Sequence, residues 1–207
     1  MYPMMLQLLN KKVVVVGGGT VACRKVLPVL QQGAHVVVVS PKLNEDLERL
    51  WLSEQINWVK RPFQKEDVEG AFLVFAATND SLINKEVADS CGPYQLINIV
   101  DNPKRSTFHV PAIHQQSHLT IAVSTNGISP LLAKKIRDEI AVHYDVQMDY
   151  YFEFLLAVRH YVKDAPLEME RKRAILSEAL SDIYKEDAEA RSYFLQQMKL
   201  SGESIIK

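Results

Sequence analysis

A run of valines that leads directly into three glycines constrains the fold of this chain more than any other feature. Val13–Val16 contain no polar residue, which is typical of a strand buried on both faces of a parallel sheet. Gly17–Gly19 follow at once, and a helix is then predicted to run to Gly33 because apolar residues recur at helical spacing: Val21, Val26, Leu27 and Leu30. A strand, a glycine turn and a helix in this order predict a βαβ unit of an α/β protein.

The glycine turn matches the G-x-G-x-x-G/A fingerprint of dinucleotide-binding folds, with Ala22 as its last small residue. The first glycine permits the tight turn, the second lets a pyrophosphate approach the backbone, and the following helix N-terminus supplies N–H donors. The predicted cofactor contacts at this turn are Gly17, Gly18, Gly19, Thr20 and Val21. Glycines that serve only a turn are the alternative, but their place between a predicted strand and a predicted helix favours a nicotinamide dinucleotide.

Strands and helices continue to alternate as far as residue 112. Further strands are predicted over 35–40, 56–59, 71–76 and 95–100, and helices over 43–52 and 81–90. Pro28 is expected to bend the first helix, because it lacks a backbone N–H. The alternation predicts an α/β fold with a Rossmann-type doubly wound parallel sheet.

The pattern changes after residue 112. One strand is predicted over 118–123, and Ser129 and Pro130 then open a helix as its N-cap and first residue. From about residue 147 to the end, the apolar spacing is helical throughout. We therefore expect a Rossmann domain over 1–112, a small connecting segment over 113–146 and an α-helical C-terminal domain over 147–207.

Charge and composition exclude several classes of protein. The 24 basic and 25 acidic residues nearly cancel, so a nucleic-acid partner is not expected. No apolar run reaches the roughly 18 residues of a membrane span, and the first residues lack the features of a signal peptide. Cys23 and Cys91 form no disulfide-like pattern, which indicates a reducing, cytoplasmic setting.

Two other strands end in polar residues at the edge where such sheets bind ligands. The second strand ends in Ser40, Pro41 and Lys42 instead of an acid, so the Ser40 hydroxyl and backbone groups are expected to contact the ribose. Lys42 can also favour a 2′-phosphate, so this feature does not separate NAD from NADP. The fourth strand is followed by Thr78 and Asn79, which are either cofactor contacts or part of a helix N-cap over 79–81.

Five motifs occur in one order along the chain: Gly17–Ala22 with Arg24-Lys25, Ala76–Asn79, Asn98–Asp101, Phe108–Ala112 and Ala122–Pro130. Together they resemble the precorrin-2 dehydrogenase and sirohydrochlorin ferrochelatase module of sirohaem synthases, from about residue 2 to about residue 145. The resemblance implies that NAD⁺ takes a hydride from precorrin-2 and that sirohydrochlorin is formed. It also implies a homodimer with its interface in segment 113–146, and a stand-alone module without a methyltransferase half.

Asp101 matches the acidic residue that the resemblance makes central. It follows the fifth strand, at the edge where the nicotinamide is expected, and a carboxylate there can accept the proton that accompanies hydride removal. The alternative is that Asp101, Asn102 and Pro103 form only a turn.

A polar loop precedes the helix at Pro130 and consists of Ser124, Thr125, Asn126 and Gly127. It is predicted to bind a substrate carboxylate near a helix N-terminus, and a plain turn with a cap is the equal alternative. His114 is a candidate proton carrier. No metal site is expected from His109, His114 and His118, since Pro111 argues against one helix there. Basic residues are either further carboxylate partners or a solvated face: Lys104, Arg105, Lys134, Lys135 and Arg137.

These observations favour an NAD-dependent precorrin-2 dehydrogenase. A bifunctional enzyme that also inserts Fe²⁺ into sirohydrochlorin is the first alternative, because the Asp101 carboxylate can also take protons from pyrrole nitrogens. A nucleotide-sensing module without turnover is the second, since Rossmann domains serve many functions. The polar groups at 101 and 124–126 speak against that second alternative.

Overall fold

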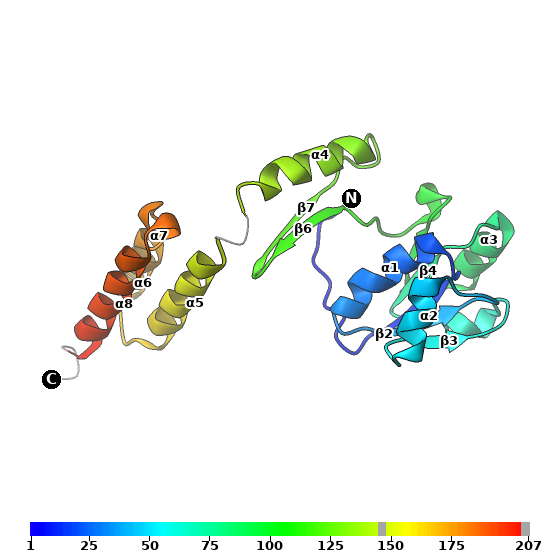
Figure 1. Cartoon of the computed structure of the whole chain (residues 1–207), viewed down its shortest axis with the longest axis horizontal. Coiled ribbons are helices and arrows are strands. Elements are labelled where there is room, and N and C mark those ends of the chain that lie inside the picture. Colours follow the sequence, from blue (N-terminus) through cyan, green and yellow to red (C-terminus); the bar gives the residue numbers. More distant parts are fainter. Residues whose placement is uncertain (145–147, 204–207) are drawn as a thin grey trace. The chain divides into compact units, whose positions relative to one another are not determined.

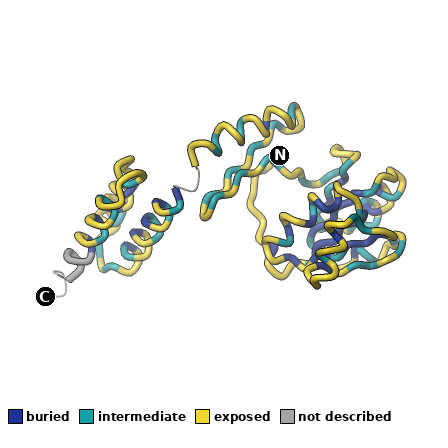
Figure 2. The backbone as a smooth tube through the Cα atoms, in the orientation of Figure 1, coloured by how far each residue is buried: buried dark blue, intermediate teal, exposed yellow. Residues whose placement is uncertain are grey.

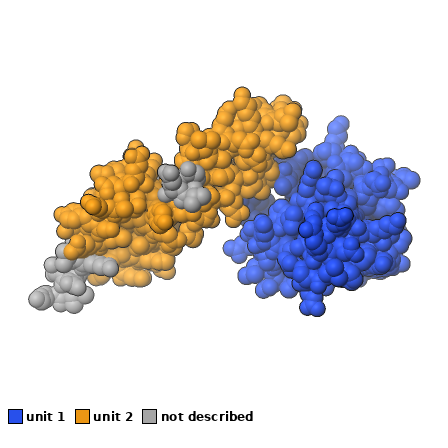
Figure 3. Space-filling model, viewed as in Figure 1, with its two compact units in different colours: residues 1–110 blue, residues 111–207 orange. Residues whose placement is uncertain are grey.

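The computed structural model describes residues 1–144 and 148–203 of the chain. It divides into two compact units, Met1–Val110 and Pro111–Lys207 (Figures 1 and 3). The predicted separation of 113–146 from 147–207 falls at residues 145–147, which lie outside the described residues, and it stays a prediction.

The first unit is built on a five-stranded parallel sheet, as predicted. Its strands are β1 (Lys12–Val16), β2 (His35–Val39), β3 (Asn57–Val59), β4 (Leu73–Ala76) and β5 (Leu96–Ile99). They lie in the order β3-β2-β1-β4-β5, and every neighbouring pair is parallel. The strand order reverses between β1 and β4, and open α/β sheets bind their ligands at the carboxyl ends of the strands at such a point.

Helices cover both faces of this sheet. They are α1 (Thr20–Gln31), α2 (Glu45–Leu52) and α3 (Ser81–Ser90), with short 3₁₀ turns η1 (Lys65–Val68) and η2 (Pro103–Arg105). Val13 and Val15 belong to the core beneath α1 and α2, whereas Val14 and Val16 belong to the core beneath α3. This two-sided burial, visible as dark blue in Figure 2, explains why the valine run contains no polar residue.

The first helix continues through Pro28. Pro28 lies within α1, is exposed and stands in the last turn, so its missing hydrogen bond falls near the helix end. Gly33 follows with a φ of +74°, and its N–H donates to the Leu30 carbonyl at 2.9 Å. The predicted glycine stop is therefore present, two residues beyond the last helical residue.

The second unit begins with a hairpin of β6 (Ala112–Gln116) and β7 (Leu119–Val123), followed by α4 (Pro130–Ala141), which packs against both strands. The sequence predicted only the second strand, because β6 carries three consecutive polar residues, His114 to Gln116. Ser129 caps α4 as predicted, and its hydroxyl oxygen accepts the Leu132 N–H at 3.1 Å.

Within 148–203 four helices follow, as the helical spacing predicted: α5 (Asp149–Asp164), α6 (Met169–Glu178), α7 (Ile183–Glu186) and α8 (Ala188–Glu203). Phe154, Val158 and Val162 of α5 are buried in a core of their own. The ring of Phe154 meets that of Phe194 edge to face, with centroids 5.6 Å apart.

Candidate functional site

The glycine turn after β1 leaves no space for side chains at its first two positions. Gly17 has a φ of +127°, and a Cβ atom on it would lie 2.3 Å from the carbonyl oxygen of Ala77. A Cβ atom on Gly18 would lie 1.9 Å from the carbonyl oxygen of Lys42. A Cβ atom on Gly19 would meet nothing within 4 Å, so the turn is open on that side. The backbone is thus exposed at Gly19, where the fingerprint places a pyrophosphate.

The start of α1 offers unsatisfied donors at the same place. Gly19 is the N-cap residue, no side chain caps the helix, and its first turn carries no acidic residue. The first N–H groups of a helix lack partners inside the helix and, together with its dipole, attract anions. The exposed Thr20 and Val21 stand at this end. These features, with the open side of Gly19, fit the pyrophosphate of a dinucleotide.

At the end of β2, the side chain of Ser40 is already hydrogen-bonded within the protein. Ser40 is buried, with 8% of its surface exposed, and its hydroxyl donates to the Lys42 carbonyl at 2.7 Å. The Ser40 carbonyl accepts from the indole N–H of Trp58 at 2.8 Å. The Ser40 hydroxyl proton is therefore committed, and only its oxygen lone pairs remain available to a ribose. Pro41 and Lys42 are exposed.

The polar turn after β4 is closed by a residue that sequence reasoning missed. Asn84 of α3 is buried, its Oδ1 accepts from the Thr78 N–H at 3.1 Å, and its Nδ2 donates to the Thr78 carbonyl at 3.1 Å. Asp80 is the N-cap of α3 and accepts the Leu82 N–H at 2.8 Å. Asn79, between them, is exposed. The available signal was the position of Asn84 in the sequence. It lies three residues before the apolar Val87 and therefore on the same, buried face of α3.

Asp101 lies in the turn that follows β5. The ladder continues one residue past the strand, where the Val100 N–H donates to the Ala76 carbonyl at 3.1 Å, so Asp101 emerges at the carboxyl edge. Its side chain is exposed, and within residues 1–144 and 148–203 no hydrogen bond or ion pair engages it. Only β4 separates β5 from β1. Two strand spacings, about 10 Å, therefore separate the ends of the strands that carry Asp101 and the glycine turn.

The chain after Asp101 folds back along β5 and fixes this turn. The hydroxyl of Ser106 accepts the Ile99 N–H at 2.9 Å, and that of Thr107 accepts the Ile97 N–H at 2.9 Å. Arg105 forms an ion pair with Asp89 of α3. The edge strand is thereby satisfied by side chains, and the carboxylate of Asp101 stays free of them.

The polar loop of the second unit is closed by its own residues. Thr125 Oγ1 donates to the Ser129 carbonyl at 2.9 Å and accepts the Ser129 N–H at 3.0 Å. Asn126 and Gly127 have φ angles of +52° and +85°. Thr125 thus builds the turn, whereas the side chains of Ser124 and Asn126 are exposed.

The histidines of this region do not act as one helical group. His114 and the chain after it lie in the β6–β7 hairpin, which confirms that no helix joins them. His114 Nε2 lies 2.9 Å from the Tyr144 carbonyl; since a carbonyl only accepts, Nε2 is the donor, and in the neutral ring Nδ1 is then the acceptor. His118 pairs with Glu153 at 3.2 Å. Among the described residues, no three His, Cys, Asp or Glu side chains are grouped as metal ligands.

Several of the basic residues have acidic neighbours in the structure. Lys135 lies 3.8 Å from Glu139, and Arg137 lies 2.7 Å from Asp138, both on the surface of α4. These pairs support the solvated-face interpretation for α4.

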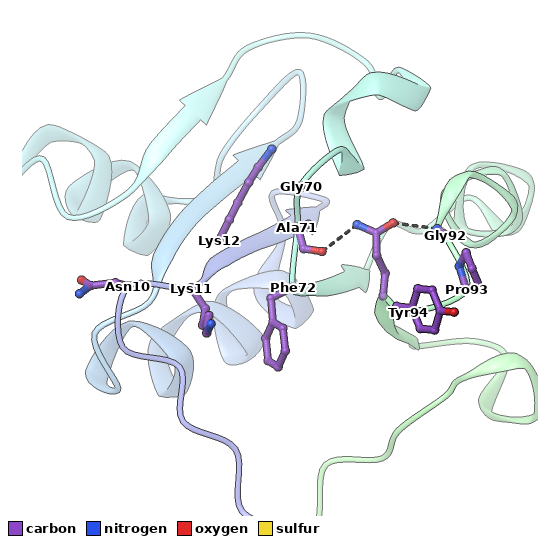
Figure 4. A pocket seen from close by; sticks show the side chains of 10 residues that line it. Asn10, Lys11, Lys12, Gly70, Ala71, Phe72, Gly92, Pro93 and Tyr94 are labelled. Carbon is purple, nitrogen blue, oxygen red and sulfur yellow. Dashed lines mark hydrogen bonds between the residues drawn. The ribbon is translucent and has the colours of Figure 1, made fainter.

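A separate cavity of about 620 Å³ lies at the amino edge of the sheet, opposite the glycine turn (Figure 4). Its wall includes Lys11, Phe72 and Tyr94, and the Gln95 side chain donates to the Ala71 carbonyl at 2.7 Å. None of the predicted site residues lines it, so it is not the dinucleotide site.

No described helix is both long and apolar enough to cross a membrane.

Three family models match consecutive parts of the chain. Residues 4–112 match the family described as "Putative NAD(P)-binding", residues 116–143 match "Sirohaem biosynthesis protein central", and residues 148–194 match "SirC C-terminal domain".

Named relatives agree with these matches. The chain is 32% identical to a precorrin-2 dehydrogenase of Priestia megaterium over 96% of this chain and 98% of that protein. It is 36% identical to a precorrin-2 dehydrogenase of Bacillus subtilis over 68% of this chain and 86% of that protein. A siroheme synthase of Mannheimia succiniciproducens is 38% identical, but the chain spans only 29% of its length.

A solved structure is similar over nearly the whole chain. The structure named "SirC, precorrin-2 dehydrogenase" has a TM-score of 0.86 and 32% sequence identity, and the match covers 96% of this chain and 99% of that one. Fold and sequence therefore point to the same relatives.

Proposed function

The chain belongs to the precorrin-2 dehydrogenase family, and from this membership we propose that it oxidises precorrin-2 to sirohydrochlorin, with a nicotinamide dinucleotide as hydride acceptor. The observation that carries the proposal is the unpartnered carboxylate of Asp101, two strands away from the open glycine turn at the carboxyl edge of one sheet. A binding turn and a free base at one edge are what an oxidation needs that removes a hydride and a proton together.

The residues of the chain divide this work. When bound, the dinucleotide supplies the acceptor for the hydride that leaves precorrin-2. The backbone of Gly17–Gly19 and the first N–H groups of α1 hold the pyrophosphate, and Thr78 and Asn79 border it at the end of β4. Asp101 accepts the proton that precorrin-2 loses, so atoms and charge balance: one hydride goes to the cofactor and one proton to the carboxylate.

We assign NAD as the preferred cofactor. Because the hydroxyl proton of Ser40 is donated to Lys42, its oxygen can accept a hydrogen bond from a ribose hydroxyl but can donate none to a phosphate. A 2′-phosphate would place charge against this buried oxygen, and the Lys42 ammonium that could offset it is exposed to solvent. We expect the ratio of kcat/KM for NAD⁺ over NADP⁺ to exceed one by a large factor; a ratio below one contradicts the assignment.

We further propose that the polar loop and His114 serve the substrate. The exposed side chains of Ser124 and Asn126 stand beside the start of α4, and the Ser124 hydroxyl, whose oxygen accepts the Asn126 N–H at 3.2 Å, keeps its own proton to donate. The closed turn built by Thr125 and Gly127 holds them in place. Precorrin-2 carries several carboxylates, and hydroxyl, amide and helix N-terminal groups bind such anions. The free Nδ1 of His114 is suited to carry a proton.

A homodimer is the proposed assembly, with segment 113–146 at the interface. Its surface is apolar at several positions that the described part of the chain leaves open: Ile128 (88% exposed), Leu131 (78%), Leu132 (46%) and Val142 (75%). Such a patch is typical of a protein interface. We also propose a cytoplasmic location, in keeping with the free thiols of Cys23 and Cys91.

The test is an anaerobic assay of purified protein with precorrin-2 and NAD⁺. Its readout is the absorbance of the reduced nicotinamide and of sirohydrochlorin. Both products are expected in equal amounts. Cofactor binding without either product overturns the proposal and favours the nucleotide-sensing alternative. Sirohydrochlorin supplied with Fe²⁺ tests the ferrochelatase alternative in the same apparatus.

A further inference from the structure

Lys25, in the second turn of α1, carries an ammonium group that its surroundings do not neutralise. Its side chain is half-buried, and across residues 1–144 and 148–203 neither a carboxylate nor a hydrogen-bond acceptor engages its Nζ. Burial lowers the pKa of Lys25, because the ammonium loses hydration without gaining a counter-charge. A cation held under such conditions marks a candidate binding site for an anion.

An aromatic pair holds the ammonium in place. Nζ lies 5.8 Å from the ring centroid of Phe75, which is buried in β4. The ring of Phe108 meets that of Phe75 edge to face at 5.6 Å, and the Asn98 Nδ2 donates to the Phe108 carbonyl at 3.1 Å. An aromatic face attracts an ammonium group but does not cancel its charge. The contact therefore orients Lys25 toward β4 and β5 and leaves its charge available.

This position lies close to the reacting edge. Phe75 precedes Ala77 by two residues, about 7 Å along a strand, and the Ala77 carbonyl is the atom that excludes a side chain from Gly17. Phe75 pairs with Asn98 in the β4–β5 register, and Asn98 precedes Asp101 by three residues. The ring that Lys25 contacts thus lies just below the carboxyl edge of the sheet. It is on β4, next to β5, the strand that leads into Asp101.

We infer that Lys25 binds a carboxylate of the tetrapyrrole substrate and so positions that substrate beside Asp101. The inference rests on the proposed function, because precorrin-2 is the polycarboxylate that this function brings to the edge. A carboxylate that reaches Nζ forms a charge-assisted hydrogen bond and supplies the missing counter-charge. The pyrophosphate of the cofactor is the weaker candidate, since the glycine turn and the first turn of α1 already supply its donors.

Lys25→Met removes the ammonium and keeps an unbranched apolar side chain that is one atom shorter, and Lys25→Arg keeps the charge. Lys11→Met is the matched control: Lys11 Nζ also lies over a ring, 5.6 Å from Phe72, but at the amino edge of the sheet (Figure 4). In Lys25→Met the KM for precorrin-2 is expected to rise about 10- to 100-fold, the loss for one charge-assisted hydrogen bond. The kcat and the Kd for NAD⁺ are expected to stay near wild type, as are all constants of Lys11→Met.

Each other outcome decides against the inference. An unchanged KM for precorrin-2 in Lys25→Met, with normal turnover, overturns the role of Lys25 and leaves the proposed function standing. A raised Kd for NAD⁺ with an unchanged KM for precorrin-2 overturns it in favour of the cofactor pyrophosphate. If wild-type protein neither binds nor oxidises precorrin-2, the proposed function falls and the inference falls with it. Lys25→Gln serves the same test if the methionine variant does not fold, and partial recovery in Lys25→Arg identifies the charge as the cause.

Discussion

Replacement of Asp101 by asparagine separates catalysis from stability more cleanly than any other single change in this protein. The variant keeps the size of the side chain and removes its ability to accept a proton. Because the carboxylate is exposed and no described residue bonds to it, the free energy of unfolding is expected to change by no more than about 0.5 kcal/mol. The glycine turn is untouched, so the Kd for NAD⁺ is expected to remain at its wild-type value.

The expected loss lies in turnover alone. A positioned general base contributes about 100- to 10,000-fold to a rate, which corresponds to about 2.7 to 5.4 kcal/mol of activation free energy. The kcat for sirohydrochlorin formation in Asp101→Asn is expected to fall by a factor in this range. Asp164→Asn, which removes another exposed carboxylate at the end of α5, is the matched control and is expected to leave kcat unchanged.

The measurements are steady-state rates under anaerobic conditions, a titration with NAD⁺ and a thermal unfolding curve for each variant. Turnover of Asp101→Asn within a few-fold of wild type refutes the assignment of Asp101 as the base. A fall in turnover accompanied by an equally large loss of NAD⁺ affinity or of stability refutes the reasoning too, because the carboxylate would then serve the cofactor or the fold.

Four further variants test the candidate site and the fold of the unit that carries it. Gly17→Ala is expected to lose several kcal/mol of folding stability, because its Cβ meets a backbone carbonyl at a positive φ. Gly19→Ala, in open space, is expected to fold normally and to weaken NAD⁺ binding in a titration; equal stability losses in both contradict this. Asn84→Ala leaves the part-buried Thr78 N–H without its acceptor and is expected to cost about 1–3 kcal/mol in urea unfolding; an unchanged midpoint rejects the structural role of Asn84. Burial raises the pKa of Asp67, but hydrogen bonds from Arg61 and from the Gln64 N–H lower it by more than burial raises it. The pKa of Asp67 is therefore depressed overall. A carboxyl group whose pKa is depressed in the folded state stabilises the fold at pH values above its unfolded pKa of about 3.9. This stabilisation is lost as the pH falls from there through the lower pKa of the folded state. Arg61→Ala is therefore expected to show a smaller acid-induced loss of stability than wild type.

The architecture of the first unit could be predicted because its signals are local. Val13–Val16 lack polar residues since both faces of β1 are covered, and three consecutive glycines stand directly between this strand and α1. Ser81–Ser90 is a helix over the predicted range. Each of these features depends on neighbours in sequence or on a two-sided core, which a residue pattern reports directly.

What could not be predicted depends on pairing between distant residues. The polar strand β6 exists because β7 pairs with it over its whole length, although His114 carries no strand signal. The buried Asn84 amide is visible only once α3 is placed beside the turn at Thr78. The Ser40 hydroxyl was predicted to contact a ribose, and the sequence did not show that its proton is donated to the Lys42 carbonyl.

The candidate site shows the same division. The sequence was sufficient to propose Asp101 and the glycine turn, because both follow predicted strands of one parallel sheet. Lys25 belongs to the first of the five motifs, but the sequence assigned it no role. Neither its lack of a counter-charge nor its contact with Phe75 can be predicted from the spacing of residues along the chain.

The atoms that lie nearest to Gly17 and Gly18, the carbonyl oxygens of Ala77 and Lys42, belong to the main chain, and this limits how the enzyme can be re-engineered. No second substitution can make room for a larger residue there, since a carbonyl group cannot be trimmed as a side chain can. A library aimed at a change of cofactor gains nothing by varying these two positions. It should also retain Ser40, whose hydroxyl holds the Lys42 carbonyl against the turn. Diversity belongs at the exposed Pro41 and at the side chain of Lys42, where new recognition can be tried while the turn itself stays intact.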